Sequence, residues 1–442
     1  MLRTALGRAQ KRQGLPHSKT LTPVLLKLET ENLNLTFGDA EIVVIGGGGV
    51  GCGVVHSLCQ AGKTDVLLLE KNEALASETT SQAAGLVGQV RTSVDRVKLA
   101  MWSVKTFSAM EAEPEAKPGW RQVGSLRVAL TDERVVEFEQ MKSTADEAGL
   151  ETAFISADEA RDKWPMFDFS PAKSVLWCPS DGYLQPNDLA MAYAHRARQA
   201  GARLATGVTV EGIRTENGRV TGVDTNRGAI ACDTVINAAG AHAWHIAQMA
   251  GLSLPIFPVR HEYFVSVDAD GMHPDLPVMR VPDASLYLRA EINGLLLGGW
   301  EPESLSLKPD EFKNGETPPR IDEDWDVMGW FIEQITPLYG KAADLGVRSI
   351  FKGWPTFVPD GKFIIGESQQ LGGLVMAGGC NAHGVSGSAG IGRHVVESML
   401  EPEPSDYVRS LSPDRFLDTE WDYAAAQTSA KRVYETYYGL GS

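Results

Sequence analysis

Apolar runs and residues at helical spacing alternate along the chain and predict its elements. Three short runs without a charged side chain predict buried strands, at 42–45, 234–240 and 374–377. Apolar residues three or four positions apart predict helices at 93–110, 132–148, 188–199, 324–338 and 388–400. This order of strands and helices is typical of an α/β protein.

A second pattern, strands without intervening helices, occupies the middle of the chain. Turns that contain glycine predict a small meander of strands at 209–214, 220–225 and 230–233. Further along, the sequence predicts an antiparallel sheet with strands at 260–267, 284–291 and 294–300. We therefore expect a mixed α/β (α+β) chain in which an antiparallel sheet is interleaved with the α/β part.

The stretch 40–71 has the order strand, glycine turn, helix, strand. Its glycines Gly46, Gly48 and Gly51 fit the pattern G-x-G-x-x-G. The first allows a tight turn, the second lets a pyrophosphate approach the backbone, and the third lets the helix pack close to the strand. In this context the pattern predicts a dinucleotide site, although an isolated match in a chain with 45 glycines would be weak.

An acidic residue supports this interpretation. Glu70 ends the second strand of the unit, nineteen residues after Gly51. A carboxylate in that place can accept hydrogen bonds from ribose hydroxyls, whereas a loop that merely turns the chain gives no reason for it. A second glycine-rich loop, 378–387, opens the last long helix and predicts another cradle for an anion or a carbonyl group.

Length, charge and cysteine content narrow the class of protein. With 442 residues the chain is too long for one simple core, so we expect two closely linked domains. A formal net charge of −16 argues against nucleic acid and anionic membranes as partners. No run of eighteen apolar residues predicts a membrane span. Five scattered cysteines without a C-x-x-C pair predict a reducing compartment and no structural zinc.

The charged residues within 1–28 are all basic. This composition resembles a mitochondrial transit peptide, but it also fits a basic tail of a cytoplasmic protein. We therefore expect the cytoplasm or, alternatively, the mitochondrial matrix.

Several motifs together resemble one family of flavin enzymes. They are the glycine stretch 46–51, the Thr-Ser-Gln-Ala-Ala-Gly-Leu loop 80–86, the strands 258–263 and 286–291, and the pair His383-Gly384. In this combination the chain is similar to the D-amino-acid oxidase/glycine oxidase group, and it looks closest to the FAD domain of the dimethylglycine and sarcosine dehydrogenases. The resemblance implies a Rossmann-like FAD-binding domain of the glutathione-reductase type with an interleaved antiparallel-sheet substrate domain.

The resemblance also implies which residues hold an extended FAD. Those at the ADP part would be Gly46, Gly48, Gly51, Glu70 and Lys71, with the adenine against the backbone of Val210. Those flanking the flavin linker would be Gln82, Ala83, Gly85 and Leu86. Those at the isoalloxazine would be Gly379, His383, Gly384 and Val385, where a helix N-terminus stabilises negative charge on the reduced ring.

Three positions depart from the family pattern. The dehydrogenases often carry a covalently attached histidine where this chain has Gln82, so the FAD should be non-covalent. The strand 353–356 also lacks the cysteine by which monomeric sarcosine oxidases attach FAD. Ser386 stands where those oxidases hold the substrate carboxylate with a lysine, so another group must bind a carboxylate here.

For the chemistry, the resemblance implies oxidation of a secondary or tertiary N-methyl amine, similar to sarcosine or dimethylglycine. Hydride would pass to flavin N5, and hydrolysis would release formaldehyde. His261 and Tyr287 match the catalytic pair of the family, although on pattern alone they would be ordinary sheet residues. Arg289 or Arg91 would pair with an anionic group of the substrate.

Two alternatives stay open. Ser386 leaves room for a different amino or imino acid as substrate, and the missing covalent histidine also suits a non-catalytic FAD-fold regulatory subunit. Oxygen or an electron-transfer protein would reoxidise the flavin. The dehydrogenases continue past this region into a folate-binding domain, so the one-carbon unit is expected to leave as formaldehyde or to reach a separate folate-binding subunit.

These observations predict a discontinuous domain organisation. The FAD-binding domain would comprise 39–95, 175–256 and 345–402, and the substrate-binding domain 96–174 and 257–344. A basic extension, 1–38, would precede them and a C-terminal tail, 403–442, would follow.

Overall fold

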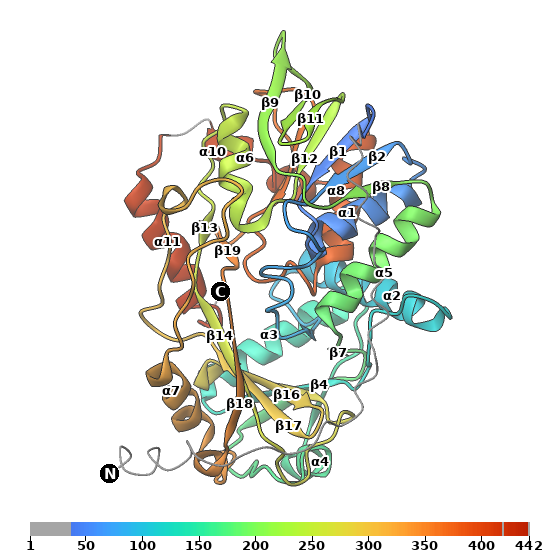
Figure 1. Cartoon of the computed structure of the whole chain (residues 1–442). Helices are drawn as coiled ribbons and strands as arrows, with labels where there is room; N and C mark the ends of the chain where they lie inside the picture. Colours follow the sequence, from blue (N-terminus) through green and yellow to red (C-terminus); the bar gives the residue numbers. More distant parts are fainter. Residues whose placement is uncertain (1–36, 418–419, 441–442) are drawn as a thin grey trace, which may run out of the picture. The chain divides into compact units, whose positions relative to one another are not determined.

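The computed structural model of the protein describes residues 37–417 and 420–440, and Figure 1 shows its elements. The basic extension expected at 1–38 lies outside this part except for its last two residues. None of the helices within the described ranges is long and apolar enough to cross a membrane.

A six-stranded sheet contains the three apolar runs that the sequence predicts as buried strands. Its order is β20 (Ile364–Glu367), β21 (Leu374–Gly378), β12 (Thr234–Asn237), β1 (Ile42–Ile45), β2 (Val66–Leu69) and β8 (Arg203–Ala205). All neighbouring pairs are parallel except β20 with β21. The strand ends of β1 and β12 lead directly into the loops that form the site.

The two faces of this sheet are covered differently, which explains why its strands are apolar throughout. One face packs against helices α1 (Gly49–Gln60), α5 (Pro186–Gln199) and α8 (Ser388–Leu400). The other face packs against the meander β9 (Val210–Glu216), β10 (Arg219–Thr225) and β11 (Gly228–Ala231), and against α6 (Ala243–Met249). Alternate residues of each strand therefore enter different cores, as with Val44 and Val43.

A second sheet has eight strands, which come from two separate stretches of the chain, 125–178 and 261–353. Its order is β18 (Val347–Gly353), β14 (His261–Ser266), β17 (Gly294–Gly299), β16 (Leu286–Glu291), β15 (Val278–Val281), β4 (Ser125–Ala129), β6 (Ser174–Cys178) and β5 (Ala153–Ile155). The pairing is antiparallel except between β15 and β4. Helices α4 (Ala157–Lys163) and α7 (Trp325–Ile335) contribute to the core beside it, and α2 (Val94–Ala112) packs on α3 (Asp132–Ala148).

Short elements join the two sheets. Two-stranded pairs form between β3 (Leu86–Val87) and β7 (Gly182–Tyr183), and between β13 (Phe257–Pro258) and β19 (Thr356–Phe357). The 3-10 turns are η3 (Gly240–His242), η4 (Pro282–Ala284), η5 (Pro309–Glu311) and η6 (Ala342–Asp344).

The segment predicted as a C-terminal tail is folded in its described part. It contains α9 (Asp406–Ser410), α10 (Asp414–Leu417) and α11 (Tyr423–Glu435). Helix α11 runs beside β13 and β19 (Figure 1), and its Ala430 and Tyr434 are fully buried. The tail prediction needs this correction because small residues along one face of α11 let the helix pack closely on aromatic side chains.

The predicted fold class, a Rossmann-like unit interleaved with an antiparallel sheet, is confirmed. The sequence missed β15 and β6, and β15 makes the second sheet mixed rather than fully antiparallel. Strands β6 and β18 pair within the eight-stranded sheet, although the predicted boundaries assign most of both to the FAD-binding domain. The domain division itself stays a prediction.

Candidate functional site

A cavity of about 560 Å³ lies among the N-terminus of α1, the loop 79–86, the eight-stranded sheet, the loop 378–386 and the end of α11. A smaller cavity of about 100 Å³ adjoins it and shares Gly48, Thr80 and Gly240 in its lining. Together they form one elongated space that begins beside β2 and ends at the eight-stranded sheet.

The glycine turn after β1 has the geometry that its sequence pattern requires. Gly46 has a φ of +109°, and a Cβ there would lie 2.5 Å from the carbonyl oxygen of Ala238. A Cβ on Gly51 would lie 1.9 Å from the carbonyl oxygen of Gly46, so the helix approaches the strand only because the side chain is absent. Gly48 caps α1 and lines both cavities, which leaves the positive end of the helix dipole facing the elongated space.

The smaller cavity holds the other residues predicted for the ADP part. Glu70, Lys71 and Val210 all line it. The carboxylate of Glu70 accepts from the Gly47 amide at 2.7 Å and from the Asn72 amide at 2.8 Å, so it is fixed in place. Lys71 forms an ion pair with Glu78 at 2.5 Å.

The loop 79–86 crosses from the glycine turn to the second sheet. Gln82, Ala83, Gly85 and Leu86 all line the large cavity. Gly85 has a φ of +73° and no room for a Cβ, which would lie 2.2 Å from the carbonyl oxygen of Leu184. Thr80 ties the loop to the glycine turn because its hydroxyl accepts from the Gly49 amide at 3.0 Å.

The loop 378–387 closes the opposite side of the large cavity. His383, Gly384 and Val385 line it, as predicted, but Gly379 does not. Gly379 has a φ of +59°, and a Cβ on it would meet the side chain of Val358 at 2.3 Å. It therefore turns the chain behind the cavity wall, and its neighbour Cys380 takes the lining position.

The ring of His383 has an assigned tautomer. Its Nδ1 lies 2.8 Å from the carbonyl oxygen of Asn381, which only accepts, so Nδ1 carries the proton. Its Nε2 then accepts from the hydroxyl of Tyr437 at 2.8 Å. Burial lowers the pKa of His383 well below its usual value, and the charge of Arg91 adds to the effect.

His261 and Tyr287 lie together in the wall of the large cavity. The hydroxyl of Tyr287 lies 2.7 Å from Nε2 of His261, and the hydroxyl of Tyr434 lies 3.0 Å from Nδ1. Tyr434 donates to Glu301, so it accepts from Nδ1–H of His261. Nε2 is then an acceptor, and the hydrogen bonds run in one direction from Tyr287 through His261 and Tyr434 to Glu301.

Burial keeps the residues of this hydrogen-bond series neutral, except for Glu301 at its end. Burial lowers the pKa of His261 to about 3 and raises that of Tyr287 above its usual value. Burial also raises the pKa of Glu301 to about 7, against the hydrogen bond from Tyr434 and the charge of Arg260. The guanidinium of Arg260 lies 3.3 Å from the Glu301 carboxylate, so charge at this end is compensated.

Of the two arginines proposed for an anionic group, only Arg91 lines the large cavity. Arg289 is 3% exposed, and its guanidinium donates to the carbonyl oxygen of Ala84 at 2.9 Å and pairs with Glu291 at 2.5 Å. It also lies over the ring of Tyr183. Contrary to the role expected from the sequence, Arg289 lies outside the cavity lining and fastens the loop 79–86 to the sheet.

Sequence reasoning missed several residues that line the large cavity. They are Arg96, Arg127, Arg280, Trp300 and Tyr437. Arg127 and Arg280 could have been found because each is a single charged residue inside an apolar strand, in Leu-Arg-Val and Met-Arg-Val. Burying a charge is costly unless it is paired, so such a residue indicates a binding partner. Trp300 stacks on Tyr437 with ring centroids 3.7 Å apart, a contact between distant segments that no local pattern signals.

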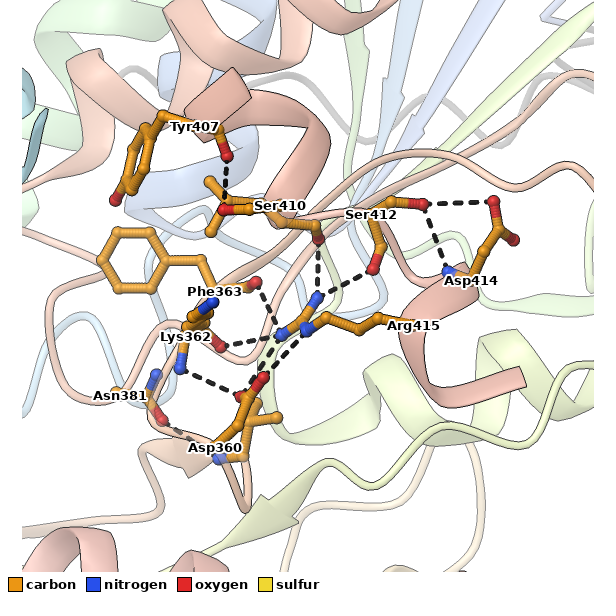
Figure 2. A network of polar contacts seen from close by, with 11 residues as sticks. Asp360, Lys362, Phe363, Asn381, Tyr407, Ser410, Ser412, Asp414 and Arg415 are labelled. Carbon is orange, nitrogen blue, oxygen red and sulfur yellow. Dashed lines mark hydrogen bonds and ion pairs between the residues drawn. The ribbon is translucent and has the colours of Figure 1, made fainter. Parts of the chain in front are cut away.

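Arg415 is another missed residue, and it fixes a turn at the cavity wall. Figure 2 shows its guanidinium between Asp360 and the carbonyl groups of Lys362 and Phe363. The turn 358–361 contributes Pro359, Asp360 and Gly361 to the cavity lining. Asn381 holds the other end of this turn by accepting from the Val358 amide at 3.0 Å. Helix α10 thus positions a wall of the site without entering it.

Fold and site together define a flavin-dependent oxidoreductase. The family model described as FAD dependent oxidoreductase (DAO) matches residues 41–398, and the chain therefore belongs to this family. The predicted family and its FAD dependence are confirmed.

Individual relatives refine the comparison. The chain is 32% identical over 382 residues to 4-methylaminobutanoate oxidase (formaldehyde-forming) of Paenarthrobacter nicotinovorans, covering 85% of this chain and 45% of that protein. It is 30% identical over 406 residues to mitochondrial sarcosine dehydrogenase of Homo sapiens, covering 90% and 43%. The chain thus spans about half the length of these relatives.

Two further likenesses bear on fold and role. The solved structure of L-proline dehydrogenase from P. horikoshii superimposes with a TM-score of 0.78 at 26% identity, covering 87% of this chain and all of that one. The mitochondrial pyruvate dehydrogenase phosphatase regulatory subunit of Mus musculus is 28% identical over 380 residues, covering 85% of this chain and 43% of that protein.

The residues present fit FAD. Two glycine-led helix starts, at Gly48 and before α8, open on one elongated space, and a Cβ on Gly49 would reach 3.4 Å from the carbonyl oxygen of Gly384. The Glu70 carboxylate lies at the narrow end of this space, where a ribose of the dinucleotide belongs. The hydrogen-bonded pair Tyr287–His261 lies at the wide end.

Proposed function

We propose that the protein oxidises a secondary or tertiary N-methyl amino acid and releases formaldehyde. The directed hydrogen-bond chain Tyr287–His261–Tyr434–Glu301 carries this proposal, because it leaves an acceptor facing the cavity. The hydroxyl of Tyr287 donates its hydrogen bond to His261, so the lone pairs of its oxygen are free to accept from a substrate N–H. The relatives named 4-methylaminobutanoate oxidase and sarcosine dehydrogenase support the substrate class.

Residues of this chain prepare the amine for oxidation. FAD, when bound, would supply the hydride acceptor for the oxidation of the N-methyl carbon. An ammonium group in the cavity donates to the oxygen of Tyr287, and loss of its proton exposes the nitrogen lone pair that the reaction needs. His261 holds Tyr287 in place, and Glu301 ends the chain at a carboxylate that can take up a proton near neutral pH.

The remaining roles follow from position. We assign Gly46, Gly48, Glu70, Lys71 and Val210 to the ADP part, Gln82, Ala83, Gly85 and Leu86 to the linker, and His383, Gly384 and Val385 to the ring. Gly51 serves the ADP part from behind the lining, because it lets α1 pack against the glycine turn. Gln82 has no nucleophile to form a covalent flavin bond, so the cofactor should be non-covalent. Oxygen or an electron-transfer protein as acceptor, a separate folate-binding subunit, and a cytoplasmic or mitochondrial location stay predictions.

A flavin reduction assay tests the proposal. The purified holoenzyme is mixed without oxygen with sarcosine, N,N-dimethylglycine or 4-methylaminobutanoate, and we expect the visible flavin band to bleach and formaldehyde to appear. Tyr287→Phe removes the acceptor and should slow bleaching by about 10²- to 10⁴-fold. The matched variant Tyr339→Phe, in the core beside α7 rather than at the cavity, should bleach at the normal rate.

A second candidate is a regulatory subunit that holds FAD without turning over amines. The likeness to the phosphatase regulatory subunit favours it. If the flavin stays oxidised with every N-methyl amine, even after prolonged incubation, this candidate replaces the first. Formaldehyde formed in proportion to flavin reduction excludes it.

A further inference from the structure

Four arginines gather at one end of the large cavity. This arginine cluster consists of Arg91, Arg96, Arg127 and Arg280, all of which line the cavity. Arg127 of β4 and Arg280 of β15 are register partners in the parallel pair, and Arg280 is also the register partner of Tyr287 in β16. Side chains in register on neighbouring strands share a face, so both guanidinium groups stand in the same row as the catalytic tyrosine.

The cluster is built into the protein rather than laid on its surface. Arg127 is 6% exposed and Arg280 is 7% exposed. Arg91 and Arg127 converge on one acceptor, the carbonyl oxygen of Val90, at 2.8 and 3.0 Å. A Cβ on residue 88 would lie 2.9 Å from Arg280, so Gly88 leaves the space that the guanidinium occupies.

No acid in the described part of the chain pairs directly with the cluster, although the charge of Asp181 acts on Arg127 at longer range. Across 37–417 and 420–440, no carboxylate oxygen lies within 4.0 Å of these four guanidinium groups. The Nη1 of Arg280 is buried and has no hydrogen-bond partner in that part of the chain. Buried guanidinium groups are otherwise paired with acids or carbonyl groups, so these donors await an anion.

The acids near the cluster make their hydrogen bonds and ion pairs with other groups. Asp181 accepts from the amide and side chain of Gln89, both at 2.9 Å, and from the hydroxyl of Ser125. Glu137 pairs with Arg134. Burial lowers the pKa of Arg91 to about 10, and the charges of Arg127 and Arg280 contribute. The excess charge is therefore large enough for the arginines to disturb one another.

We propose that Arg127 and Arg280, with Arg91, bind a second acidic group, so that the substrate is an N-methyl amino dicarboxylate. This inference rests on the proposed amine oxidation for its reacting end. One carboxylate of a simple N-methyl amino acid would balance one guanidinium and leave the others uncompensated. Two carboxylates match the planar forks of neighbouring arginines, which favour bidentate pairing.

Binding of unreactive acids tests the subsite without any turnover. Glutarate and valerate have the same chain length and differ by one carboxylate, and calorimetric titration of the holoenzyme compares them. We expect glutarate to bind about 10- to 150-fold more tightly. Arg280→Met should remove most of this difference, whereas Arg121→Met, which changes a half-exposed arginine outside the cavity, should keep it.

Oxidation of a matched substrate pair completes the test. N-methyl-L-glutamate and N-methyl-L-norvaline differ in the same way, and flavin reduction should saturate at a lower concentration of the diacid. Equal binding of glutarate and valerate by the unaltered protein overturns the subsite, even if N-methyl amines are oxidised. Tight glutarate binding without oxidation of any amine supports the subsite and instead overturns the proposed function. The wild-type comparison needs no variant to fold.

Discussion

Each ring nitrogen of His261 has one tyrosine partner, and this pairing defines both the tautomer and the charge of the residue. The ring also stacks on Trp300, with centroids 4.7 Å apart. A proton added to the ring would have no acceptor, because Tyr287 already donates to Nε2. Burial and full pairing therefore keep His261 neutral, which is the state that a hydrogen-bond relay needs.

The neutral state of His261 predicts a pH-dependent contribution to stability. Unfolded histidine binds a proton below about pH 6.5, whereas the pKa of folded His261 is about 3, so acid favours unfolding between these values. This group should lower the free energy of unfolding by up to about 1.4 kcal/mol per pH unit in that window. His261→Asn lacks the effect, so the stability advantage of the wild type over it should shrink from pH 7 to pH 4.

Urea unfolding at several pH values measures this advantage. His273→Asn, a change at an exposed histidine, serves as the control and should show a constant difference from the wild type. A difference between wild type and His261→Asn that stays constant from pH 7 to pH 4 would contradict the neutral, buried assignment.

At the scale of elements, α1 and α8 meet through their glycines. A Cβ on Gly392 would lie 2.5 Å from Oγ of Ser57 and 2.6 Å from the carbonyl oxygen of Gly53. This backbone contact brings the two helices close together, and each of them begins at a glycine loop that lines the cavity. The spacing of the two loops therefore depends on a position far from any ligand.

Gly392→Ala should destabilise the protein by about 1–3 kcal/mol, because the added methyl group overlaps the facing backbone. Gly329→Ala, in the interior of α7, should stabilise it by about 0.5–1 kcal/mol, because nothing lies within 4 Å of the new methyl group and alanine favours helices. Chemical denaturation of both variants gives the comparison. If both substitutions changed the free energy of unfolding in the same direction, helix propensity and not the α1–α8 contact would determine the effect.

Local sequence signals account for the elements predicted correctly here. The run 42–45, the glycine turn and the carboxylate of Glu70 were visible because each requirement acts within a few residues of the chain. Arg289 was assigned to the substrate because a sequence cannot tell which way a buried guanidinium points, and the structure turns it toward Ala84 and Glu291. Gly379 was predicted to contact the isoalloxazine ring because its loop, 378–387, does line the large cavity. The structure places its neighbour Cys380, and not Gly379 itself, in the lining.

At the scale of the whole molecule, α11 completes the site from the far end of the chain. Tyr434 is fully buried between β14 and Glu301, 173 residues beyond its partner His261. No pattern around Tyr434 predicts that contact, because its cause is the packing of a helix on a distant sheet. Arg127 and Arg280 were missed for a related reason: they come from separate strands that only the fold brings into register.

Two tyrosines of α11 provide a matched test of this long-range link. Tyr434→Phe removes hydrogen bonds to His261 and Glu301 and should lower the free energy of unfolding by about 1–3 kcal/mol. Tyr423→Phe should cost almost nothing, because its hydroxyl is buried without a partner in the described part of the chain. Equal losses in denaturant titrations of the two variants would mean that α11 contributes only apolar packing.

The order in which the chain is synthesised gives the position of α11 a consequence. The glycine turn, both sheets and the arginine cluster all precede residue 400 in the sequence, whereas the hydroxyl that orients His261 belongs to residue 434. The residues proposed to bind the flavin are therefore synthesised before Tyr434, the hydrogen-bond partner of His261. The pairing of His261 with Tyr434 can form only after α11 has been synthesised and has packed against β13 and β19.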